Sequence, residues 1–147
     1  MLLSEWGSIN KETLTRDQSD VLIKRGIHRK FASVWAEEVQ TFPGTTKVRQ
    51  KVKYKLFCFQ DLLRVLPKVL DFGKGQRYRL RIGYECMDHV EMLTKGQWIV
   101  GYFNKENPEQ YVLTFKYEKE LIDALYALIL DGLLKRYINP YELEDEA

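Results

Sequence analysis

Cationic side chains at alternating positions are the feature of this sequence from which a chemical function is most directly argued. Lysine or arginine recurs at every second position in two stretches of the chain, and these positions are Lys47, Arg49, Lys51, Lys53, Lys55, Arg77, Arg79 and Arg81. No acidic residue lies between Val39 and Gln60. A period of two is that of a β-strand, whose successive side chains point to opposite faces. The sequence therefore predicts two strands that each carry one cationic face.

If the two strands are neighbours, all eight cations share one sheet surface. Like charges directly opposite each other destabilise a sheet, so such a surface favours an anionic partner. Arginine can donate two parallel hydrogen bonds to a phosphate or carboxylate, whereas lysine acts as a point charge. We therefore predict that the eight residues form a binding surface. Two simpler interpretations stay open: acidic residues within 142–146 neutralise the cations, or the lysines only protect an exposed, solvated strand.

Cys86 and His89 have the Cys-x-x-His spacing of half a metal site. A closed zinc site needs four ligands. The other cysteine and histidine, Cys58 and His28, lie in no paired motif. A loop cysteine and a surface histidine are the simpler interpretation, so the sequence predicts neither a metal nor any other cofactor.

Catalytic motifs are weaker still. The chain has no Gly-x-Ser-x-Gly sequence and no glycine-rich phosphate loop of standard spacing. Cys58 lies between Phe57 and Phe59, which favours a buried, inert thiol, and pairing of Cys86 with His89 or His28 is the remaining Cys–His arrangement. The aromatic residues of the later strands are expected in the core rather than on a base-stacking surface. We predict a protein that is not an enzyme, and a metal- or cysteine-dependent enzyme is the least favoured alternative.

The helices expected to position these strands follow from the period of apolar residues. Leucine and isoleucine recur at three- and four-residue steps between 118 and 139, which predicts a long buried helix. Its charged residues make it too polar to span a membrane. Thr15 and Gln18 form a capping-box pattern ahead of a second predicted helix, 16–40, in which Gly26 is a candidate break.

The remaining elements alternate between strands and short connections. Strands are predicted at 45–57, 76–85, 97–104 and 110–117, a short helix at 60–69 and a connecting loop at 86–95. Short links between the last three strands favour an antiparallel meander. The predicted fold class is α+β, with an antiparallel sheet of three to four strands packed against the long C-terminal helix and with an N-terminal helix. Residues 1–147 are expected to form a single domain, with an arm at 1–14 and an acidic tail at 140–147.

Composition places the chain among ordinary globular proteins, with 147 residues of which 45% are hydrophobic and 30% are charged. The charge is uneven: residues 1–57 hold eleven Lys/Arg against six Asp/Glu, whereas residues 105–147 hold five against ten. This asymmetry favours either an anionic partner or a head-to-tail attraction. Two cysteines are too few for a disulfide scaffold, and no signal peptide or membrane anchor is evident, so a cytoplasmic location is expected.

The segment 59–137 resembles a group of small proteins of bacterial phages and mobile elements. The resemblance rests on a short Asp-Leu-Leu helix followed by Leu-Pro-Lys, the strand QWIVGY and the helix LIDALYALILDGLL. It implies a phage-like origin and an intracellular setting, and it brings no activity or site residues.

The predicted function combines this origin with the cationic strands. It is that of an interaction protein that binds a host protein or protein–nucleic-acid complex, and blocks or recruits it through a basic sheet face. Inhibition of a nucleic-acid-directed defence system is one form of this function. The alternative is a module that binds DNA or RNA directly, and no membrane partner is expected.

Overall fold

The computed structural model describes residues 11–42, 48–89, 92–104, 106–107, 110–118 and 120–141. Within them, the α-helices are α1 (Arg16–Lys24), α2 (Phe59–Val65) and α3 (Leu121–Leu134), and η2 (Arg29–Phe31) is a single 3-10 turn. The strands are β1 (Val34–Phe42), β2 (Val48–Leu56), β3 (Val69–Asp71), β4 (Arg77–His89), β5 (Met92–Asn104) and β6 (Tyr111–Glu118). This content confirms the predicted α+β class.

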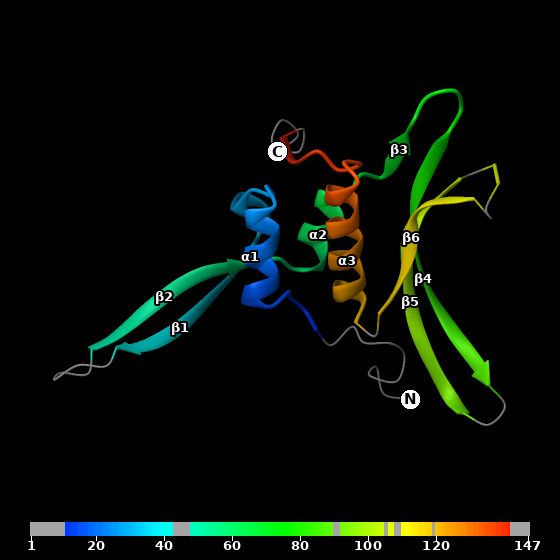
Figure 1. The fold of residues 1–147 in the computed structure, drawn as a ribbon. Helices are drawn as coiled ribbons and strands as arrows, with labels where there is room; N and C mark the ends of the chain where they lie inside the picture. The colour runs from blue at the N-terminus through cyan, green and yellow to red at the C-terminus, as the bar shows by residue number, and fades with distance from the viewer. Residues whose placement is uncertain are drawn as a thin grey trace.

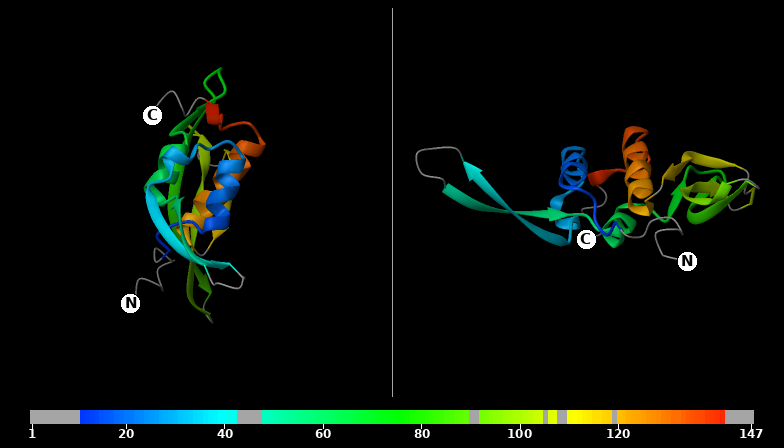
Figure 2. Two further views of the ribbon diagram at one scale, coloured as in Figure 1. Left: turned by 90° about the vertical axis from the view of Figure 1, so that its left-hand side faces the viewer. Right: turned by 90° about the horizontal axis from the view of Figure 1, so that it is seen from below.

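The strands form two separate antiparallel sheets rather than one. β1 and β2 pair only with each other in a hairpin, and the second sheet has the order β3-β4-β5-β6. Figure 1 shows the hairpin extending away from the body, with the helices between it and the four-stranded sheet. The view from below in Figure 2 shows the same order, from the hairpin through α1 and α3 to the sheet.

The predicted helix 16–40 is wrong beyond its first nine residues. Its start is confirmed, because the Thr15 side chain caps α1 and Gln18 completes the capping box. The helix ends at Lys24, and Gly26 then adopts a φ of +107°, a conformation that favours glycine and excludes further helix. The segment from Val34 onward is a strand because all nine of its residues pair with β2, and this pairing overrides the helical spacing of its apolar residues.

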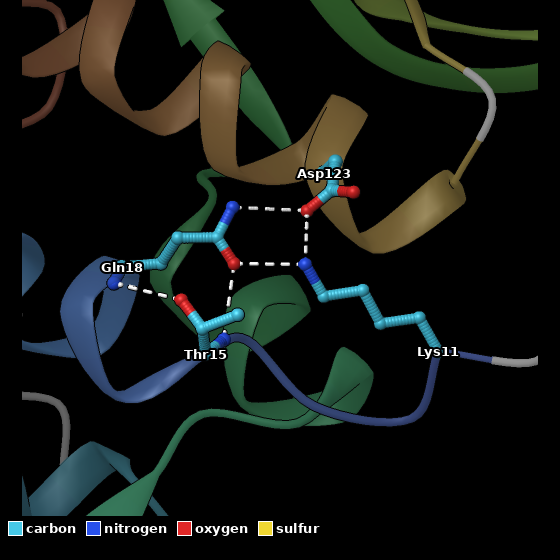
Figure 3. A network of polar contacts seen from close by, with 4 residues as sticks. All are labelled: Lys11, Thr15, Gln18 and Asp123. Atoms are coloured by element: carbon cyan, nitrogen blue, oxygen red, sulfur yellow. Dashed lines mark hydrogen bonds and ion pairs between the residues drawn. The ribbon is translucent and has the colours of Figure 1, made fainter.

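A polar network joins the start of α1 to the start of α3 (Figure 3). The Gln18 side-chain oxygen accepts from the Thr15 backbone N–H at 3.0 Å and from Lys11 Nζ at 2.9 Å. The Gln18 amide nitrogen and Lys11 Nζ both reach Asp123 Oδ1, at 3.0 Å and 2.7 Å. Gln18, which completes the capping box of α1, therefore also links α1 to α3.

The core lies between the helices and one face of the four-stranded sheet. Val100 and Tyr102 on β5 are buried, and Tyr78, Leu80 and Ile82 on β4 pack against the same cluster. The predicted inward face of the strand 76–85 is thus confirmed. The loop predicted at 86–95 is wrong, because β4 continues to His89 and β5 begins at Met92, so that the two strands form one long hairpin.

A bulge in β6 interrupts the alternation of its side chains at Leu113. The register with β5 shifts between the pairs Tyr102–Val112 and Val100–Lys116, and Leu113 at this point has a φ of +60°. Regular strand alternation would place Tyr111 and Leu113 on one face, but Leu113 is buried, whereas Tyr111 is 53% exposed. A bulge inserts unpaired residues into one strand, which breaks the strict alternation of side chains.

The C-terminal helix is shorter than the predicted 118–139. Glu118, the first residue of the predicted helix, is instead the last residue of β6, and α3 begins at Leu121. Its C-terminus closes after Leu134, where the Tyr137 N–H donates to the Gly132 carbonyl at 2.8 Å and the Arg136 N–H to the Leu133 carbonyl at 3.2 Å. This Schellman pattern requires a left-handed residue, and Arg136 supplies it with a φ of +61°.

Replacing Arg136 with glycine should stabilise the protein by about 1 kcal/mol, because a side chain in the left-handed region costs roughly 1–2 kcal/mol that glycine avoids. The midpoint of thermal denaturation should rise by about 3 °C. Lys135→Gly is the matched control, since Lys135 has a φ of −84° and gains nothing from glycine. A fall in the midpoint for Arg136→Gly, equal to that of the control, would contradict this role of Arg136.

Candidate binding surfaces

The predicted cationic residues lie on two sheets and not on a single surface. Lys51, Lys53 and Lys55 belong to β2 in the hairpin, whereas the three arginines belong to β4 in the four-stranded sheet. The expectation that all eight share one sheet surface is therefore wrong. The reason is that β2 takes β1 as its partner, a segment whose sequence periodicity indicated a helix.

The arginines of β4 lie on the face of the four-stranded sheet opposite to the core. Near one end of this face, one residue from each strand forms a continuous row, because strand pairing joins Val69 to Arg79, Arg79 to Phe103 and Phe103 to Tyr111. Directly paired residues project to the same side of a sheet. Val69 is 43% exposed and Tyr111 53%, and Arg79 between them is also exposed.

Arg77 and Arg81 extend this row along β4, and with it they make up what we call the sheet surface. Arg77 Nε lies 3.2 Å from Asp71 Oδ2, and the Arg81 guanidinium lies 5.0 Å from the centre of the Phe103 ring. The Gly73 backbone N–H, with added effect from Arg77, holds the pKa of Asp71 below its usual value, so this carboxylate stays charged beside Arg77. Among the described residues, Arg79 and Arg81 take part in no ion pair.

The lysines of β2 share a face with alternate residues of β1, which we call the hairpin surface. Pairing joins Trp35 to Lys55, Glu37 to Lys53 and Val39 to Lys51. Lys55 Nζ lies 5.0 Å from the centre of the Trp35 ring, and Lys53 Nζ lies 3.7 Å from a Glu37 carboxylate oxygen. Lys51 is exposed and is in no ion pair with a described residue.

Two of the predicted cations are only partly defined by the structure. Arg49 continues the alternation of β2 and pairs in register with Thr41, while its side chain lies outside the described part of the chain. Lys47 lies outside the described residues. So do residues 142–146, whose acidic side chains are one predicted source of charge to neutralise the cations. Within the described residues, the acidic partners on the two surfaces are Glu37 and Asp71.

The opposite face of the hairpin packs against α1. Arg16 Nη1 lies 2.7 Å from Glu38 Oε2, and the Arg16 guanidinium lies 4.5 Å from the centre of the Tyr54 ring. Both Glu38 and Tyr54 alternate with the residues of the hairpin surface. Because α1 occupies this side, the hairpin surface faces away from the body, which explains the 65% exposure of Trp35.

Exposed aromatic side chains are the functional candidates that sequence reasoning missed. Trp35 lies in the segment predicted as the helix 16–40, and Tyr111 is among the aromatic residues of the later strands that are expected in the core. The core expectation holds for Tyr102, whose hydroxyl is buried and donates to the Pro67 carbonyl at 2.6 Å. The stretch 34–42, VWAEEVQTF, has no regular alternation of apolar and polar residues, so its sequence carries no clear strand signal.

The structure defines only in part the candidate residues for metal binding and catalysis. Cys58 is half-buried rather than buried, and it lines a hollow of about 360 Å³ with Phe59, Leu121 and Ile122. Cys86 and His89 belong to β4 rather than to a loop, and their side chains lie outside the described part. No cluster of three or more potential metal ligands occurs among the described residues.

Two further findings bear on function. Within the residues that the structure describes, no helix combines the length and apolar character needed to cross a membrane. Comparison of the chain with protein-family models, with curated proteins and with solved structures gives no match in any of the three.

Proposed function

We propose that this protein is a non-enzymatic interaction protein that binds an anionic patch on a host protein complex and thereby blocks or recruits that complex. The observation that carries the proposal is the row Val69–Arg79–Phe103–Tyr111 on the outer side of the four-stranded sheet. Its mechanism is occupancy, since binding alone covers the partner's surface and no chemical step is needed.

The composition of the sheet surface supports a protein partner. Arginine, tyrosine and phenylalanine are enriched in protein interfaces, and arginine and tyrosine are frequent among the residues that dominate binding energy. Arg79 has exposed Val69 on one side and the aromatic Phe103 on the other. An arginine held among apolar neighbours can form a bidentate contact with a carboxylate from which water is excluded, where the charge-assisted hydrogen bond is strong.

The phage-like resemblance of 59–137 gives this proposal its biological setting. An intracellular protein of this type would act on a complex of the host cell, and a nucleic-acid-directed defence complex is the example we favour. The hairpin surface favours a second candidate function, direct binding of nucleic acid, because its cations with described side chains are lysines, and they lie on the same face as an exposed tryptophan.

Affinity capture from host lysate tests the proposed function. Tagged protein should retain a defined host protein complex both with and without nuclease treatment. Arg79→Glu should reduce the amount captured by more than about tenfold, because it reverses the charge at the centre of the sheet surface. Arg64→Glu is the matched control: it makes the same change of charge at an exposed position of α2, outside the sheet surface.

Three outcomes of this capture experiment would contradict the proposal. Equal capture by wild type and by Arg79→Glu would exclude the sheet surface as the binding site. Equal losses in Arg79→Glu and Arg64→Glu would show that net charge alone decides capture. Complete release of the partner by nuclease would favour direct nucleic-acid binding over the protein partner proposed here.

A further inference from the structure

The hairpin surface differs in chemistry from the sheet surface, although both are basic. Its cations with described side chains are Lys51, Lys53 and Lys55, and all three are lysines. Lysine is depleted in protein interfaces, because its ammonium group is strongly hydrated and its long side chain is costly to immobilise. It remains a common partner of phosphate, which it contacts as a point charge without strict geometry. The hairpin surface is therefore suited to a different ligand from the sheet surface.

The spacing of these lysines suits a linear polyanion. Alternate residues on one strand lie about 7 Å apart, twice the rise per residue of a β-strand. Successive phosphates of an extended single strand are separated by a similar distance, so one phosphate can approach each lysine in turn. Glu37 offsets part of the charge of Lys53, at an Nζ to oxygen distance of 3.7 Å. Lys51 has no such acidic neighbour among the described residues.

Trp35 supplies the contact that distinguishes a single strand from a duplex. Its side chain is 65% exposed at the body end of the hairpin, and it borders a surface hollow of about 430 Å³ with Ala36, Glu37 and Lys53. An unpaired base can stack on an indole ring, whereas the bases of a duplex are already stacked on each other. Lys55 Nζ lies over one face of the Trp35 ring, 5.0 Å from its centre, so a base would stack on the other face of the ring with this cation close by.

We infer that the hairpin surface binds single-stranded nucleic acid, with one base stacked on Trp35 and the adjoining phosphates along Lys55, Lys53 and Lys51. The observations that carry this inference are the exposure of Trp35 and the register that aligns it with a row of lysines. The inference adds a second binding surface to the proposed function and does not depend on the sheet surface. A protein with both surfaces could hold a nucleic-acid-loaded complex by its protein and its nucleic acid together.

Fluorescence anisotropy with a fluorescein-labelled oligodeoxythymidine, measured over a range of salt concentrations, tests this assignment. Trp35→Ala should weaken binding by about tenfold, which corresponds to about 1.4 kcal/mol, and should leave the salt dependence unchanged because stacking releases no counterions. Lys51→Gln should reduce the slope of log K against log salt by about 0.7, the value for one phosphate contact with a single strand. Glu37→Gln should strengthen binding, because it removes the acidic group from the surface.

Control variants separate this inference from the proposed function. Trp35→Phe should retain most of the affinity, since a phenyl ring also stacks, and far-ultraviolet circular dichroism of each variant checks that the fold is intact. Arg79→Gln removes one positive charge, as Lys51→Gln does, and should leave oligonucleotide binding unchanged. Conversely, Lys51→Gln should capture the host protein complex as the wild type does. The two assays therefore show separately whether the hairpin surface binds the oligonucleotide and whether the sheet surface binds the host protein complex.

Three results would overturn the inference. One is an oligodeoxythymidine affinity that is absent at low salt or unchanged in Trp35→Ala. Another is a duplex of the same length that binds at least as tightly as the single strand. The third is a reduced slope of log K against log salt in Arg79→Gln but not in Lys51→Gln. That result would place the nucleic-acid contact on the four-stranded sheet.

Discussion

Leu125→Asp should leave the protein without a cooperative folding transition. Leu125 is fully buried in α3, within the core that the helices share with the four-stranded sheet. Aspartate there would place an unpaired charge in apolar surroundings at a cost of several kcal/mol. Because a domain of this size is stable by only about 5–15 kcal/mol, this substitution consumes most or all of its stability. Thermal denaturation followed by circular dichroism at 222 nm measures the effect.

The same helix offers a matched control in Leu134→Asp. Leu134 is 72% exposed at the last residue of α3, so the same substitution there buries no charge. Its expected cost is below about 1 kcal/mol, from the unfavourable interaction of a carboxylate with the C-terminal end of the helix dipole. A cooperative transition in Leu125→Asp at nearly the wild-type midpoint would show that α3 is not part of the core.

Asp61→Ala should destabilise the protein by about 3 kcal/mol, because it removes a buried carboxylate that accepts several hydrogen bonds. Asp61 Oδ2 accepts from the Ser33 backbone N–H at 2.9 Å, the Ser33 hydroxyl at 2.8 Å and the Cys58 backbone N–H at 2.9 Å. Ser33 precedes β1 and Cys58 follows β2, so a single carboxylate holds both ends of the hairpin to the body. Urea denaturation gives the change in the free energy of unfolding.

Asp71→Ala is the matched control for this substitution. Asp71 also accepts a backbone hydrogen bond, from Gly73 at 2.9 Å, and it pairs with Arg77, but it is exposed to solvent. Exposed ion pairs contribute little to stability, so the control should lie well below Asp61→Ala. If the two variants lost the same small amount of stability, the carboxylate of Asp61 would not be what anchors the hairpin.

The sequence by itself determined the properties that depend on neighbouring residues. The alternation in 45–57 and 76–85 predicted β2 and β4, because the side-chain period of a strand is visible in the chain. The capping box at Thr15 and Gln18 predicted where α1 begins, since a cap involves residues only three apart. The spacing of apolar residues in α3 predicted a core helix for the same kind of reason, and most of them are buried, whereas Leu134 at its end is exposed.

The tertiary structure alone decided where each of these elements ends and what it contacts. The segment from Val34 to Phe42 carries apolar residues at helical spacing, yet it is a strand because β2 is available to pair with it. Strand pairing joins residues that are distant in the chain, and its hydrogen bonds override a local preference. The bulge at Leu113 and the left-handed Arg136 likewise depend on packing, because neither residue type favours a positive φ by itself.

The two candidate surfaces show most clearly the difference between what the sequence determines and what only the tertiary structure decides. The sequence predicted that Lys51 and Arg79 lie on cationic strand faces, because charge and period are local properties. Only the tertiary structure decided that these residues occupy two different sheets, with Trp35 beside one group of cations and Phe103 beside the other. The physical reason is that a sheet surface is assembled across strands, and the partner of each strand is selected by hydrogen bonding and burial over the whole chain.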